Sequence, residues 1–99
     1  MAIGLVNRFS ESFDTERYDA ITGFLDLHGN PPDGLIFQSS GHLEGVFQVF
    51  AVWESREHFD RFREERLIPA MVEAVGAEAV AQMPDAVYIE ASIHDYVVP

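Results

Sequence analysis

The chain has 99 residues, which is enough for one domain with a modest core and too few for two. Acidic residues outnumber basic ones by 17 to 6, and the formal net charge is -11. Such a charge repels nucleic-acid backbones and anionic membrane surfaces, so we expect neither as a partner. The lack of cysteine excludes disulfides, thiol catalysis and cysteine-ligated metals.

The chain shows no pattern typical of a secretory signal or a membrane anchor. The apolar stretch at residues 1–9 is short and contains Asn7 and Arg8, unlike a signal peptide. No apolar run approaches the ~18 residues of a membrane-spanning helix. We therefore expect a single cytoplasmic domain over residues 1–99.

The first half of the chain predicts two strands and a helix. Residues 2–9 have the character of a strand, and Asp14 is a candidate N-cap for a helix that ends near Gly29. A double proline then separates this helix from a second strand at residues 35–42.

The second half of the chain predicts two more strands with a helix between them. A turn at Gly45 leads into a third strand, residues 46–53, whose only polar residue is Gln48. Ser55 is the expected N-cap of a second helix, which Pro69 breaks or kinks before an apolar face continues to Gly76. Residues 87–96 are the predicted last strand.

The order β-α-β-β-α-β predicts an α+β, ferredoxin-like fold. We expect a four-stranded antiparallel sheet in the order 4-1-3-2, with both helices on one face. The third strand is apolar on both faces, which is typical of a strand that is buried on both sides. A second copy of the chain is the simplest cover for the open face, because a twofold axis lets one patch bury itself. The sequence therefore predicts a homodimer in which two sheets form a barrel.

The segment VWESREHFDRF, residues 52–62, resembles the strand-to-helix junction of the dimeric α+β-barrel superfamily. Residues 32–37, Gly45 and residues 93–96 extend the resemblance to small antibiotic-biosynthesis-monooxygenase-like proteins. It implies a dimeric α+β barrel. The activities it implies are those of cofactor-independent oxygenases, isomerases and haem-degrading enzymes, although many such proteins have no known activity.

The resemblance to the haem-degrading branch is incomplete. That branch carries an asparagine on strand one, a tryptophan on helix two and a histidine beyond it. Asn7 matches the first position, but Phe62 and Val72 stand at the other two. The resemblance therefore does not imply haem degradation.

A candidate site follows if the more apolar face of each strand meets the helices, because the even-numbered residues then face the barrel lumen. Polar groups among apolar walls suit a small-molecule site. The residues expected there are Arg8, Gln38, Ser40, His42, Gln48, Phe50, Tyr88, Glu90, Ser92 and His94.

His42 is the leading candidate for acid–base catalysis, because an imidazole titrates near neutrality. Glu90 is the second, because an apolar lumen raises the pKa of a carboxyl group. Phe50 and Trp53 are candidates for stacking an aromatic ligand. The polar candidates for substrate contact are Arg8, Gln38, Gln48, Tyr88 and His94. The plain alternatives are solvated histidines, an Arg8–Glu90 ion pair, an interface tyrosine and core aromatic rings.

Two functions remain open at this point. The first is a cofactor-independent monooxygenase or isomerase, in which a base removes a proton from a small aromatic or polyketide-like substrate and the resulting anion reacts further. The second is a non-enzymatic homodimer that binds a small apolar ligand or acts as a stress-response module. The chain has no phosphate-binding loop and no recognisable metal-ligand spacing, so we expect neither a cofactor nor a metal.

Overall fold

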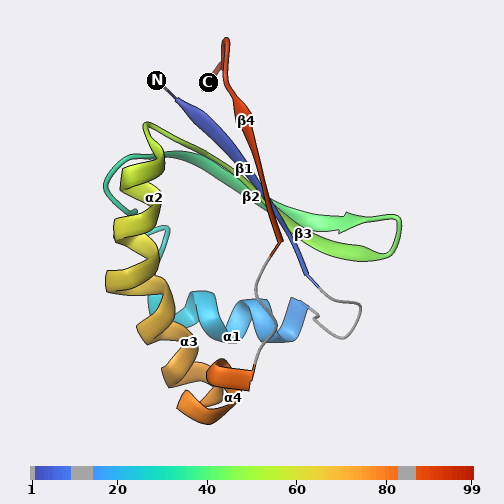
Figure 1. Ribbon diagram of the computed structural model, residues 1–99, viewed down its shortest axis with the longest axis vertical. Coiled ribbons are helices and arrows are strands. Elements are labelled where there is room, and N and C mark those ends of the chain that lie inside the picture. The colour runs from blue at the N-terminus through green and yellow to red at the C-terminus, as the bar shows by residue number, and fades with distance from the viewer. Residues whose placement is uncertain (1, 10–14, 83–86) are drawn as a thin grey trace.

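The computed structural model of the chain describes residues 2–9, 15–82 and 87–99. Its helices all lie on one side of a twisted four-stranded sheet (Figure 1). The elements in chain order are β1 (Ile3–Arg8), α1 (Thr15–Leu25), β2 (Leu35–Leu43), β3 (Val46–Trp53), α2 (Arg56–Phe62), the π-helical turn η1 (Arg63–Leu67), α3 (Ile68–Val75), α4 (Ala77–Gln82) and β4 (Val87–Ser92). In the part of the chain that is described, no helix is long and apolar enough to cross a membrane.

The strands are arranged in the order β2-β3-β1-β4, and every neighbouring pair is antiparallel. This is the predicted order, read from the other edge, and it confirms the α+β, ferredoxin-like arrangement. One face of the sheet packs against the helices, and the other face is left uncovered within the monomer (Figure 1). The two faces therefore have different roles.

The core lies between the sheet and the helices, and Trp53 is at its centre. Only 1% of Trp53 is exposed. Its ring centroid lies 5.6 Å from that of Phe59 and 5.3 Å from that of Phe62, both on α2. Leu5 and Ile21 belong to the same buried cluster. Full burial of one such side chain stabilises the fold by about 1.5–3 kcal/mol.

The start of α2 confirms the cap predicted at Ser55. The Ser55 hydroxyl accepts a hydrogen bond of 3.2 Å from the backbone N–H of His58, which satisfies one of the free donors of the first turn. The His58 ring nitrogen Nδ1 lies 2.7 Å from the same oxygen.

The helical pattern is interrupted before Pro69 rather than at it. In η1 the backbone N–H of Ile68 bonds to the carbonyl of Arg63, five residues back. Pro69 then occupies the first turn of α3, where its missing N–H needs no partner. As expected, α3 ends at Gly76, whose φ of 92° suits a residue without a side chain.

The main differences from the prediction concern one helix end, one additional helix and one strand end. The chain leaves α1 at Leu25, before a turn in which Asp26 has a φ of 50°, and so does not continue to Gly29. The short helix α4 was not predicted, and β4 ends at Ser92 rather than at Tyr96. The predicted cap Asp14 lies outside the described residues.

The structure corrects the predicted faces of the second and fourth strands. A register shift between Leu35 and Phe37 places Gln38 opposite Ala51, on the face that meets the helices. Directly opposed residues share a face, so Ser40 and His42 follow Gln38 to the helix side. In β4, Glu90 pairs with Leu5, and the even-numbered residues again lie on the helix side.

The prediction is right for the two central strands. Gln48 and Phe50 lie on the uncovered face, where they pair with Arg8 and Val6. Arg8 is the last residue of β1, and it also borders the space between the sheet and the helices. The predicted lumen set is therefore divided between the two faces of the sheet. His94 follows the end of β4 and is exposed.

Candidate functional site

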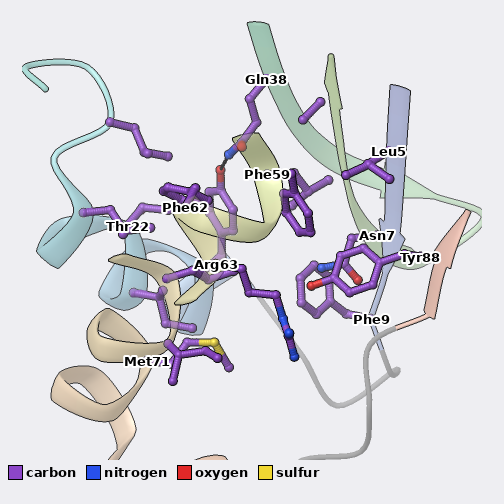
Figure 2. Close-up of a pocket in the computed structure, with 18 of the residues that line it drawn as sticks. Leu5, Asn7, Phe9, Thr22, Gln38, Phe59, Phe62, Arg63, Met71 and Tyr88 are labelled. Carbon is purple, nitrogen blue, oxygen red and sulfur yellow. Dashed lines mark hydrogen bonds between the residues drawn. The ribbon is translucent and has the colours of Figure 1, made fainter. Parts of the chain in front are cut away.

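A cavity of about 340 Å³ lies between the sheet and the helices (Figure 2). Its volume falls in the range of about 300–1,000 Å³ that is typical of small-molecule sites. Central strands supply one wall, and α1, α2, η1 and α3 supply the others. The site therefore lies on the opposite side of the sheet from the barrel lumen in which it was expected.

Aromatic and aliphatic side chains form most of the wall. Trp53, Phe59 and Phe62 provide rings from β3 and α2, and Met71 lies on α3. The Nε1 of Trp53 is buried and has no hydrogen-bond partner among the described residues. A buried donor without a partner costs free energy, so a ligand acceptor at this position would be stabilising.

The part of the wall at the ends of β1 and β4 is polar. Asn7 and Tyr88 are directly opposed in the β1–β4 register and both line the cavity. Figure 2 shows them close together, next to Phe9, with the Arg63 side chain reaching toward the same region. The Oδ1 of Asn7 is buried without a hydrogen-bond partner in the described part of the chain.

Burial raises the pKa of Tyr88 above its ordinary value. The nearby charges of Arg63 and Arg56 act in the opposite direction but do not cancel the effect of burial. Tyr88 therefore keeps its proton at neutral pH, and its hydroxyl is a hydrogen-bond donor for a ligand oxygen.

A second polar pair lies between α1 and β2. Gln38 Nε2 donates a hydrogen bond of 3.0 Å to Tyr18 Oη, and both residues line the cavity (Figure 2). The Tyr18 ring is held in turn by Phe47, with ring centroids 5.1 Å apart. This pair holds α1 against an edge strand and fixes one side of the cavity.

Four of the nine predicted site residues line this cavity: Arg8, Gln38, Trp53 and Tyr88. The two predicted catalytic residues do not. His42 lies near the β2–β3 turn, where its exposed ring packs edge-on against Phe47 with centroids 5.3 Å apart. Glu90 accepts a hydrogen bond of 3.0 Å from Arg56, so its ion-pair partner is Arg56 and not Arg8.

The other predicted residues also lie elsewhere. Gln48 and Phe50 are on the uncovered face, and His94 is exposed beyond β4. No group of three or more histidine or acidic side chains that could hold a metal ion is found among the described residues.

Sequence reasoning did not select Arg63, Arg17 or Tyr18 as site residues. A signal for Arg63 was present, because it lies four residues after Phe59 and therefore on the same side of the helix.

Comparison with known proteins identifies the fold. No protein-family model matches the chain, and no curated protein sequence matches it. SnoaB, a cofactor-independent oxygenase from Streptomyces nogalater, is similar in structure at 13% identity and a TM-score of 0.63, over 97% of this chain and 96% of that chain. Rv0793 from Mycobacterium tuberculosis is similar at 16% identity and a TM-score of 0.60, over 99% of this chain and 100% of that chain.

A candidate antibiotic biosynthesis monooxygenase from Chloroflexus aurantiacus J-10-fl is also similar in structure, at 14% identity and a TM-score of 0.61. The match covers 100% of both chains. At such low identities the likeness shows the fold alone. That fold is the one found in antibiotic-biosynthesis-monooxygenase-like proteins, which confirms the resemblance seen in the sequence.

Proposed function

We propose that the chain is a cofactor-independent monooxygenase that acts on a small aromatic or polyketide-like substrate in the cavity between sheet and helices. The observation that carries this proposal is the cavity itself, which has rings on one wall and Asn7, Arg63 and Tyr88 on another. The structural likeness to a cofactor-independent oxygenase supports it.

The reaction needs a substrate that readily forms an anion, such as a hydroquinone or an anthrone. Loss of a proton gives an electron-rich anion, which transfers one electron to O2. The resulting radicals combine to form a carbon–oxygen bond. The hydroperoxide loses water, so one oxygen atom stays in the new carbonyl and the other leaves with two substrate hydrogens. An isomerase would use the same anion and return the proton to another carbon.

The cavity residues suit the anion in two ways. The hydroxyl of Tyr88 and the guanidinium of Arg63 are donors for a developing oxyanion, and such preorganised donors are a major source of catalysis. The apolar walls exclude water and strengthen these interactions.

A non-enzymatic binding protein is the second candidate, and one observation favours it. Within the described residues, the cavity lining contains no aspartate, glutamate or histidine. An ordinary general base is therefore missing from the part of the wall that is seen. In this case the same cavity would hold a ligand without turnover.

We also propose that the protein acts as a homodimer through the uncovered face of the sheet. Phe37 and Phe50 pack together on that face, with ring centroids 5.7 Å apart. Leu43 and Ile89 belong to the same face, and each is 53% exposed. A patch of this kind is typical of an interface, and a twofold axis would bury it against itself.

Oxygen consumption tests the enzymatic proposal. The purified, metal-stripped protein is mixed with a panel of hydroquinones, anthrones and naphthols, and O2 uptake and product are measured together. We expect one O2 consumed per carbonyl formed, with a lower rate for Tyr88→Phe. If no member of the panel turns over while an aromatic ligand still raises the melting temperature, the binding function replaces the enzymatic one.

A further inference from the structure

The charge of the cavity is opposite to the charge of the chain. Three of the six basic residues, Arg8, Arg17 and Arg63, line this one cavity, although the chain as a whole carries a formal net charge of -11. None of the described lining residues is acidic. A cationic ligand would therefore meet only like charge in this wall, and an anionic ligand would meet opposite charge.

Arg63 is the best placed of the three arginines. It belongs to η1 and lines the cavity, and its charge acts on Tyr88 in the same wall. Among the described residues Arg63 pairs with the carboxylate of Glu64, which lies 3.6 Å away, and the two side chains are 44% and 69% exposed. Such an exposed pair is worth little, so the guanidinium keeps most of its capacity to bind another anion.

The aromatic wall indicates the chemistry of the rest of the ligand. The ring centroids of Phe59 and Phe62 lie 5.6 and 5.3 Å from that of Trp53, and all three residues are buried. Flat aromatic ligands gain most from such rings, and a charged group placed there would lose its hydration. The ligand should therefore have a charged end and an apolar end.

We infer that the ligand of this cavity is an aromatic carboxylate with a single negative charge. Its carboxylate lies against Arg63 and the hydroxyl of Tyr88, and its ring system lies toward Trp53. This inference rests on the cavity of the proposed function but not on turnover. It also accounts for the lack of acidic and histidine side chains in the described lining, because a carboxylate is ionised at neutral pH without a protein base.

Calorimetric titration with two matched probes tests the inference. The probes are 2-naphthoate and its neutral analogue naphthalene-2-carboxamide, which share the ring system and differ in charge. We expect 2-naphthoate to bind at least about tenfold more tightly, the difference that one charge-assisted hydrogen bond supplies. Added salt should weaken the binding of 2-naphthoate and leave that of the carboxamide unchanged.

Two variants locate the charge. Arg63→Gln should reduce the affinity for 2-naphthoate by about tenfold and leave the carboxamide affinity unchanged. Arg61→Gln is the matched control: it removes the same charge from an exposed position on α2 that does not line the cavity, and we expect no change. Circular dichroism and the melting temperature confirm that both variants are folded.

The outcomes separate this inference from the proposed function. Equal affinity for both probes, or an equal loss in the two variants, overturns the anionic ligand while the cavity remains a binding site. Binding of neither probe overturns the ligand class and also counts against the cavity as the site. Tight, Arg63-dependent binding of 2-naphthoate without O2 uptake by any substrate supports the inference and contradicts the oxygenase.

Discussion

Gln38 on β2 donates a hydrogen bond of 3.0 Å to the hydroxyl of Tyr18 on α1, and this contact joins an edge strand to a helix beside the cavity. Twenty positions separate the two residues in the chain. The bond is half-buried, so its loss would leave a polar group partly without water or protein partners.

Tyr18→Phe should therefore lower the free energy of unfolding by about 1 kcal/mol, because it removes the bond and keeps the ring contact with Phe47. Urea denaturation measures the change. In a double-mutant cycle with Gln38→Leu, the two losses should be less than additive. Additive losses would show that the bond contributes nothing to stability.

Gly34 is a position where a side chain should be costly. It has a φ of 86°, and a Cβ built there would overlap the His58 ring. We expect Gly34→Ala to destabilise the protein by about 2–4 kcal/mol, from backbone strain and overpacking together. Gly45 has a φ of 79° in open space, so Gly45→Ala should cost only about 1–2 kcal/mol.

His58→Ala provides the control for the Gly34 experiment. Removing the ring should relieve only part of the overlap, because the His58 Cβ would also lie 2.6 Å from the added carbon. The cost of Gly34→Ala in that background should therefore fall but stay above the cost at Gly45. An unchanged cost would show that the ring does not contribute. Thermal denaturation of the four proteins gives the comparison.

Tyr88 makes stability depend on pH in the alkaline range. Because its pKa is raised in the folded state, its neutral form is favoured there. The contribution of this burial to the free energy of unfolding is fully present below the tyrosine pKa of the unfolded state, about 10. It is lost as pH rises from that value toward the pKa of the folded state. Wild type should therefore lose more stability between about pH 8 and 10.5 than Tyr88→Phe does.

Tyr96→Phe is the matched control for this titration, because Tyr96 is 45% exposed near the C-terminus. Over the same pH range, the Tyr96→Phe variant should lose as much free energy of unfolding as wild type does. If Tyr88→Phe also loses as much as wild type, burial of Tyr88 has no effect on its ionisation. The measurement is urea denaturation at each pH.

Phe50→Arg tests the proposed dimer. Phe50 lies on the uncovered face of the sheet, where an arginine would be buried without a partner in the dimer. We expect the variant to weaken the dimer by about 3–5 kcal/mol. Sedimentation should show a dimeric wild type at micromolar concentration and a monomeric variant. A monomeric wild type would contradict the dimer.

The position of His42 changes what we expect of it. It lies outside the cavity lining, so His42→Ala should leave the affinity for 2-naphthoate within about twofold of wild type, a difference of less than 1 kcal/mol. A loss of tenfold or more would restore the acid–base role predicted from the sequence. Because that role would then need a path to the cavity, the rate of O2 uptake is measured in the same variant.

Much of the fold was predictable because its signals are local. The third strand is apolar except for Gln48, Ser55 is a capping residue directly before a helix, and Gly76 adopts a positive φ at the end of one. Each signal depends on a few neighbouring residues. The strand order then followed from the sequence of elements.

The site was harder to predict because it depends on the register between strands. A strand residue changes face with every single-residue shift, and the irregularity between Leu35 and Phe37 moves Gln38 and His42 to the other side of the sheet. No local pattern in the sequence marks that irregularity. Similarly, nothing in the sequence distinguishes η1 from an ordinary helical turn, although η1 carries Arg63.

The π-helical turn explains how both halves of one long helical segment can line the cavity. A wide turn takes up one extra residue within a continuous helix, whereas each α-helical residue turns the chain by about 100°. If that residue were wound into an α-helical turn instead, everything from Ile68 onward would be rotated relative to α2, which would turn Met71 out of the wall. Deleting Glu64, an exposed residue of η1, should leave an ordinary α-helical turn and keep Met71 in the wall. The alignment of the two halves of this wall therefore depends on how the chain winds between Phe62 and Ile68 as much as on which residues they are.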